Sequence, residues 1–232
     1  SFDAAGSMLW SNSVQIASGA HSISAVAGLP NGGALLAVYS DSTDSTIMIV
    51  LGSNGAEADE IVYDLGSHII NAIVPYANDY YMALSDSGIL MIEDDGHAVF
   101  HYGGAAGSSI NIASARLTPD GILMSGSDQS GSSLGAYSSL YNPALVLNPV
   151  LWSNTLADPL GQLDIEHNDL ALDTAGNFAA AGSIRNIAGG TVVPTLHRIN
   201  PVGASVSLSS FAAFVDGRFE GLIPNQSAAN VV

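Results

Sequence analysis

Three carboxylates stand close together in one strand-like segment of the chain: Asp164, Glu166 and Asp169. Asp164 and Glu166 are two residues apart, so on a β-strand their side chains point to the same face. Oxygen ligands with this spacing suit Ca²⁺. The segment therefore predicts either a calcium site or, as the commoner arrangement for such residues, a solvated or hydrogen-bonded strand end.

Two tryptophans, Trp10 and Trp152, occur in similar contexts, because each is followed by Ser-Asn. An indole ring has a large apolar face and one polar N–H group, so it serves either as a packing residue or as a platform on which a sugar stacks. We expect packing between repeated units, with sugar stacking as the alternative function of these two residues.

Other catalytic motifs are missing from the sequence. The chain has no cysteine and no lysine, which excludes thiol nucleophiles, thiolate metal sites and a phosphate-binding loop that ends in lysine. The one Gly-x-Ser-x-Gly match, at 131–135, falls in a Ser- and Gly-rich stretch that is typical of a flexible loop. These absences predict a protein that is not an enzyme and that needs no cofactor, with Ca²⁺ as the one ion considered.

The charge balance excludes several classes of partner. Four arginines stand against 21 carboxylates, which gives a formal net charge of −17. Nucleic-acid phosphates and anionic membrane surfaces both attract clustered Lys and Arg, so neither is expected to bind. No run reaches the ~18 apolar residues that a membrane span requires. Together with the low content of charged residues, 11%, this composition favours a secreted or cell-surface protein.

Turn signals of two kinds alternate along the chain and separate short apolar runs. The first kind lies at 31–33, 78–80, 119–121, 174–176 and 216–217, and the second at 5–6, 54–55, 95–96, 142–143 and 202–203. Gly, Asn and Asp at such positions are typical of β-hairpin turns, and helical spacing of apolar residues is rare. The alternation predicts an all-β fold of repeated four-stranded units.

Repeats of this length are typical of β-propeller blades. We predict a single β-propeller domain, 1–232, of five four-stranded blades. The blades cover 20–66, 67–104, 105–158, 159–210, and 211–232 together with 1–19. The fifth blade combines both ends of the chain, so strand exchange between the termini closes the ring. A two-sheet sandwich, or a piece of a longer repeat array, is the alternative.

The repeats resemble those of secreted and cell-surface bacterial β-propellers. The similarity lies in Phe2–Ser11, which reads Asp, small residues, Gly, apolar residues and Trp, and in the Pro-Asn-Gly-Gly and Pro-Asp-Gly steps of 27–37 and 115–123. The second repeat lacks the Pro and the fourth lacks the Trp. The resemblance implies an extracellular scaffold and no particular reaction.

The innermost strand of each blade would line the central channel, and we expect these strands at 22–29, 69–76, 110–117, 163–172 and 207–214. A propeller glycosidase needs carboxylates from different blades on both sides of one sugar bond. Only 163–172 carries acidic residues, which argues against that class.

We therefore predict a non-catalytic structural or adhesive module that acts through protein–protein contacts, as a subunit of a larger assembly or by self-assembly. A carbohydrate-binding propeller that recognises glycans is the alternative. An enzyme acting on glycosides ranks third.

Overall fold

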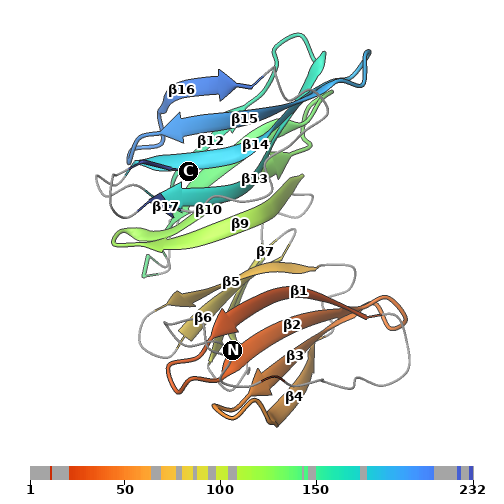
Figure 1. Ribbon diagram of the computed structural model, residues 1–232, viewed down its shortest axis with the longest axis vertical. Helices are drawn as coiled ribbons and strands as arrows, with labels where there is room; N and C mark the ends of the chain where they lie inside the picture. The colour runs from red at the N-terminus through yellow and green to blue at the C-terminus, as the bar shows by residue number, and fades with distance from the viewer. Residues whose placement is uncertain are drawn as a thin grey trace. The chain divides into compact units, whose positions relative to one another are not determined.

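The computed structural model describes residues 11, 21–63, 69–76, 80–85, 88–93, 98–103, 109–142, 144–145, 150–172, 177–211, 224–225 and 230–231. Every regular element in these ranges is a β-strand (Figure 1). The chain is all-β in its described part, as the turn pattern predicted. In the same part, no helix is long and apolar enough to cross a membrane.

Sixteen of the strands form four antiparallel sheets of four strands each. The first sheet contains β1 (His21–Gly28), β2 (Ala34–Ser40), β3 (Ser45–Leu51) and β4 (Glu57–Tyr63). The second contains β5 (Ile70–Tyr76), β6 (Tyr80–Ser85), β7 (Gly88–Glu93) and β8 (Ala98–Gly103). The third contains β9 (Ile110–Thr118), β10 (Gly121–Asp128), β11 (Gly135–Tyr141) and β12 (Val150–Leu156). The fourth contains β13 (Leu163–Leu172), β14 (Phe178–Asn186), β15 (Val192–Ile199) and β16 (Ser205–Ser210). A separate pair joins β17 (Pro224–Asn225) to β18 (Asn230–Val231).

Each four-stranded sheet is a simple meander, because its strands neighbour one another in chain order (Figure 1). Turns of the first predicted kind join the first and second strands, at Asn31–Gly33 and Asp120–Gly121. Turns of the second kind join the third and fourth, at Asn54–Gly55 and at Gly203. Gly32, Gly55 and Gly203 have φ between 77° and 85°, which explains why glycine occupies these turns.

The four sheets repeat the same irregularities of register. Each first strand carries one β-bulge opposite the second strand, at Ser24, Asn71, Ala113 and Asn168. Each fourth strand carries one opposite the third, at Ala58, Val99, Leu151 and Val206. A bulge bends its strand and increases the local twist, and on an edge strand it hinders pairing with a foreign strand. The sheets are therefore copies of one structural unit.

The chain divides into two compact units, 1–105 and 106–232. In the first unit, β1 lies against β5, and a core forms from residues of both sheets, among them Leu35, Met48, Ile70 and Ile92. In the second unit, β13 lies against β9, β10 and β11. The core between those sheets contains Leu123, Leu140, Leu170, Phe178, Ala180 and Ile199.

One predicted inner strand is wrong. Residues 207–210, which we expected to begin the inner strand 207–214 of a fifth blade, belong to β16, the fourth strand of the fourth sheet. The turn at Gly203 folds the chain back on β15, and pairing with β15 then fixes these residues in that sheet. Trp10, and the joining of 211–232 with 1–19, lie outside the described residues except for Ser11, Phe211 and the short strands β17 and β18.

Candidate functional site

The three carboxylates singled out in the sequence all lie on one face of β13. Asp164, Glu166 and Asp169 pair with Arg185, Ser183 and Ala181, which alternate along β14. Residues opposite each other in an antiparallel pair share a face. Simple alternation would put Asp169 on the other face, but the bulge at Asn168 shifts the register by one residue. The bulge thus brings Asp169 to the face of Asp164 and Glu166.

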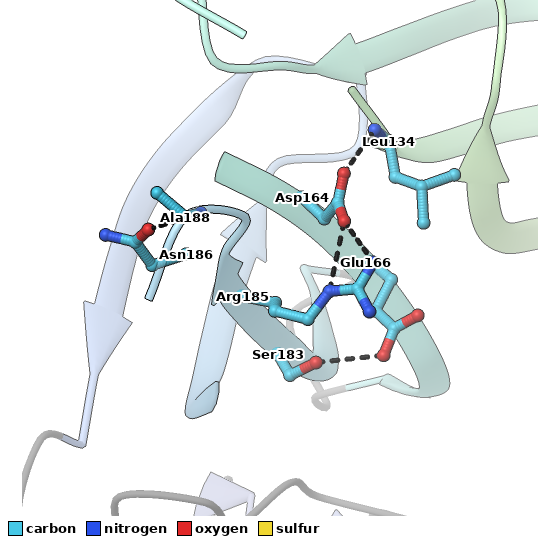
Figure 2. A network of polar contacts seen from close by, with 7 residues as sticks. All are labelled: Leu134, Asp164, Glu166, Ser183, Arg185, Asn186 and Ala188. Carbon is cyan, nitrogen blue, oxygen red and sulfur yellow. Dashed lines mark hydrogen bonds and ion pairs between the residues drawn. The ribbon is translucent and has the colours of Figure 1, made fainter. Parts of the chain in front are cut away.

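Asp164 is buried and ties two sheets together. Its Oδ1 accepts a hydrogen bond of 2.9 Å from the backbone N–H of Leu134, in the turn before β11, while its Oδ2 accepts from Arg185 on β14 (Figure 2). The N–H group of Leu134 and then the Arg185 guanidinium hold the pKa of Asp164 below its usual value, because both favour the charged carboxylate. Asp164 therefore stays ionised and holds the β10–β11 turn against β13.

Glu166 and Asp169 also have partners on the protein. Glu166 accepts a hydrogen bond of 2.9 Å from the Ser183 hydroxyl (Figure 2). Asp169 accepts bonds of 2.8 Å from Ser114 and 2.9 Å from Arg116, both on β9 of the neighbouring sheet. Two of the four arginines of the chain are thus paired with carboxylates of β13. The pair Arg116–Asp169 joins the third sheet to the fourth, and the pair Arg185–Asp164 links two strands of the fourth sheet.

All three carboxylates of the predicted calcium site have partners within the protein, and the calcium site stays a prediction. Ca²⁺ needs six to eight oxygen ligands that converge on one point. Here the guanidinium groups of Arg185 and Arg116 already supply the positive charge that Asp164 and Asp169 would share with an ion. Within the ranges that the structure describes, no group of three or more His, Asp or Glu residues is arranged to hold a metal ion. The carboxylates make ion pairs and hydrogen bonds both within the fourth sheet and to the third.

A row of polar residues crosses the third sheet from its first strand to its fourth. Ser114, Ser125, Ser138 and Asn154 are mutual register partners on β9, β10, β11 and β12, so they share one face. We call these four residues the polar row. Ser114 donates to Asp169, Ser138 lies 3.3 Å from the Nδ1 of His167, and Asn154 donates to the carbonyl of Gly203. The polar row therefore faces the fourth sheet and bonds to it at three of its four positions.

Two buried histidines of the fourth sheet lie next to the polar row. The Nδ1 of His167 on β13 lies 3.3 Å from the carbonyl oxygen of Tyr137, and its Nε2 lies 3.2 Å from the Nδ1 of His197 on β15. The Nε2 of His197 lies 2.8 Å from the Ser205 hydroxyl on β16. Both histidine side chains are almost fully buried.

Bonding rules favour one pair of tautomers for the two rings. The Nδ1 of His167 lies 3.3 Å from both the Tyr137 carbonyl oxygen and the Ser138 hydroxyl. A proton on Nδ1 satisfies the carbonyl, which only accepts, whereas a lone pair on Nδ1 would face the carbonyl oxygen. The Nε2 of a neutral His167 then has a lone pair, which accepts the N–H of His197 Nδ1. The Nε2 of His197 is left as an acceptor for the Ser205 hydroxyl. One set of protons thus satisfies every nitrogen of both neutral rings.

Burial and mutual repulsion keep the histidine pair neutral. Desolvation, followed by the nearby His197, lowers the pKa of His167 from 6.5 to about 3. Desolvation also lowers the pKa of His197. The direction follows because burial penalises the charged form of each ring and because two imidazolium groups in contact would repel.

Trp152 packs between the third and fourth sheets. Its ring stacks on Phe178 at a centroid distance of 5.6 Å, and its indole N–H donates to the carbonyl of Pro201. Gly203 lies so close that an added Cβ would stand 2.5 Å from the ring. Trp152 therefore has the environment of a packing residue, the first of the two uses that the sequence suggested.

The sequence did not reveal the histidine pair or the arginine partners. The histidine pair could have been found from the alternation of buried positions. On β13, His167 follows buried Ile165 by two residues, and on β15, His197 lies between buried Thr195 and Ile199. A histidine at a buried strand position must find partners, but those partners come from other strands and cannot be found from local spacing.

We expect Asp164→Ala to destabilise the second unit by about 1–3 kcal/mol, because it leaves the Leu134 N–H group without its acceptor. Arg185→Ala should cost less, since the Arg185 side chain is 55% exposed and a solvated ion pair contributes little. Urea unfolding measures both. Glu57→Ala, an exposed carboxylate on β4, is the control for the change in net charge. Equal losses for Asp164→Ala and Glu57→Ala would contradict this role for Asp164.

No protein-family model matches the chain, and no curated protein matches it. Among solved structures, the chain is similar to a protein of unknown function from Bacteroides caccae, with 15% sequence identity and a TM-score of 0.48 over 90% of this chain. It is also similar to BamB from Moraxella catarrhalis, with 13% identity and a TM-score of 0.39, over 87% of this chain and 79% of that one. The chain spans 63% of the length of the Bacteroides caccae protein.

Proposed function

We propose that this chain is a non-catalytic, exported or cell-surface β-propeller module that acts through protein–protein contacts between copies of itself. The repeated bulges support the propeller, since four sheets with one register pattern are the units from which such rings are built. In the proposed ring, a fifth blade contains residues from both ends of the chain.

The observation that carries the proposed contact is the exposed strand β16. All six residues of this strand are exposed and none is charged, and Val206 and Leu208 expose 61% and 40% of their surface. β16 has no partner on its outer side among the described strands. By contrast, β4, the outer strand of the first sheet, carries Glu57, Asp59 and Glu60. In a chain of net charge −17, β16 is a place where two copies meet with little local repulsion.

The contacts of the β13 carboxylates and of Trp152 support a structural function. The carboxylates of β13 bond to Arg185, Ser183, Ser114 and Arg116. Trp152 packs on Phe178. These contacts stabilise the fourth sheet and its packing on the third.

Sedimentation velocity over a range of protein concentrations tests the proposal. We expect association that strengthens with added salt, because salt screens the repulsion between acidic copies. Val206→Asp should weaken the association at least about tenfold by placing charges in the contact. The control is Leu160→Asp, an equally apolar residue that is 76% exposed between β12 and β13, and it should leave the association unchanged. A chain that stays monomeric throughout, or equal effects of the two substitutions, would contradict the proposed contact.

A further inference from the structure

The Ser205 hydroxyl differs in its surroundings from the other serines of β16. All four serines of this strand, Ser205, Ser207, Ser209 and Ser210, are exposed. Ser207, Ser209 and Ser210 lie opposite Arg198, Leu196 and Thr195 of β15. The Ser205 Oγ lies 2.8 Å from the Nε2 of His197, which is the distance of a good hydrogen bond.

With the favoured tautomers, the residues behind His197 give this hydrogen bond its direction. The carbonyl of Tyr137 accepts from the Nδ1 of His167, and the Nε2 of His167 in turn accepts a hydrogen bond from His197 Nδ1. His197 therefore presents the lone pair of its Nε2 to Ser205, and Ser205 donates its proton. A hydroxyl that is bonded to a base, with the base held by a third group, is the arrangement that activates nucleophilic serines.

The surroundings of His197 keep the ring in its basic, neutral form. Its register partners are Ala180 on β14 and Leu208 on β16, neither of which is charged. The titratable group that contacts it is His167, itself neutral and bonded to Ser138 and Tyr137 on β11. The carboxylates of β13 belong to the opposite face of that strand. Within the described part of the chain, neither of the two ion pairs involves His197.

We propose that Ser205 is a nucleophilic serine that accepts an acyl group from an activated ester. This reaction is a modification of the protein itself, and it does not depend on association between copies.

The transfer proceeds in two steps. The Ser205 Oγ attacks the carbonyl carbon of the ester while its proton passes to the Nε2 of His197. The resulting imidazolium keeps its bond from Nδ1 to the Nε2 of His167. The tetrahedral intermediate then expels the alcohol part of the ester, which takes the proton from His197. The products are an O-acyl serine, a free alcohol and a neutral histidine, so atoms and charge balance.

The test uses two probes on the full chain, p-nitrophenyl acetate and diisopropyl fluorophosphate, at a protein concentration at which copies do not associate. With the fluorophosphate, the same attack forms an O–P bond and releases fluoride. Peptide mass spectrometry locates the label, and release of p-nitrophenolate gives the rate. We expect Ser205 to react at least about tenfold faster than Ser207 and Ser209 in the same sample. That comparison needs no substitution and so no assumption about folding.

Three variants separate the base from the residue that orients it. Ser205→Ala should abolish the rapid release of p-nitrophenolate, and His197→Gln should reduce it at least about tenfold. His167→Gln should retain most of it, because the amide oxygen of glutamine still accepts the proton of His197 Nδ1. Circular dichroism confirms that each variant is folded. Equal labelling of Ser205, Ser207 and Ser209, or no labelling of Ser205, would overturn the proposal.

Discussion

Replacing Gly182 with alanine is expected to destabilise the second unit by about 3 kcal/mol. Gly182 lies on β14 opposite His167, directly beside the bulge at Asn168. A Cβ added there would stand 1.8 Å from the carbonyl oxygen of Glu166 and 3.0 Å from the Cα of His167. Both atoms belong to the backbone, so β13 itself must move, and the contacts of the three carboxylates would move with it.

Gly126 provides an independent copy of the same test. It lies on β10 beside the bulge at Ala113, and a Cβ added there would stand 1.8 Å from the carbonyl oxygen of Asn111. The control is Gly131→Ala, since an added Cβ at Gly131 meets its nearest atom at 3.5 Å. Urea unfolding should show large losses for Gly182→Ala and Gly126→Ala, and a change within about 0.5 kcal/mol for Gly131→Ala. If all three variants unfold at the same urea concentration, the bulges do not require glycine opposite them.

Lowering the pH from 7 to 5 is expected to destabilise the second unit by about 2 kcal/mol through His167 alone. The pKa of His167 is lowered from 6.5 to about 3, so between these values the unfolded chain binds a proton that the folded chain excludes. Stability therefore rises with pH in this window. The contribution of neutral His167 to stability is complete above pH 6.5 and is lost progressively as the pH falls. His197, whose pKa is lowered in the same direction, adds to the loss.

This acid effect is separable from that of the carboxylates. The pKa values of Asp128, Asp158 and Asp164 are lowered from the usual 3.8, so their contribution is present above 3.8 and is lost at more acidic pH. Urea unfolding of the wild type and of His167→Gln at pH 7 and pH 5 measures the histidine contribution. The variant should lose about 2 kcal/mol less between these two values. An identical pH dependence of the two proteins would show that His167 is protonated in the folded state.

Much of the local structure was predictable from turn residues. Asn31–Gly33, Asn54–Gly55, Asp120–Gly121 and Gly203 all lie in hairpin turns where the pattern predicted them. The carboxylates of β13 were also recognised as a cluster. The partners of these carboxylates were not predicted, because the sequence reasoning considered residues of one strand only. Arg116 and Ser114 come from β9, more than fifty residues earlier in the sequence, and no local spacing reveals them.

The sequence by itself determined the all-β class and the hairpins, since turn residues and apolar alternation act over a few neighbouring positions. The tertiary structure decided which residues meet across the sheets. The bulge at Asn168 brought Asp169 onto the face of Asp164, and the packing of the third sheet on the fourth joined Tyr137, His167, His197 and Ser205. Both results depend on register and on contacts between distant segments. A slip of one residue reverses the face on which every following side chain lies, and that slip is visible only when both strands are in place.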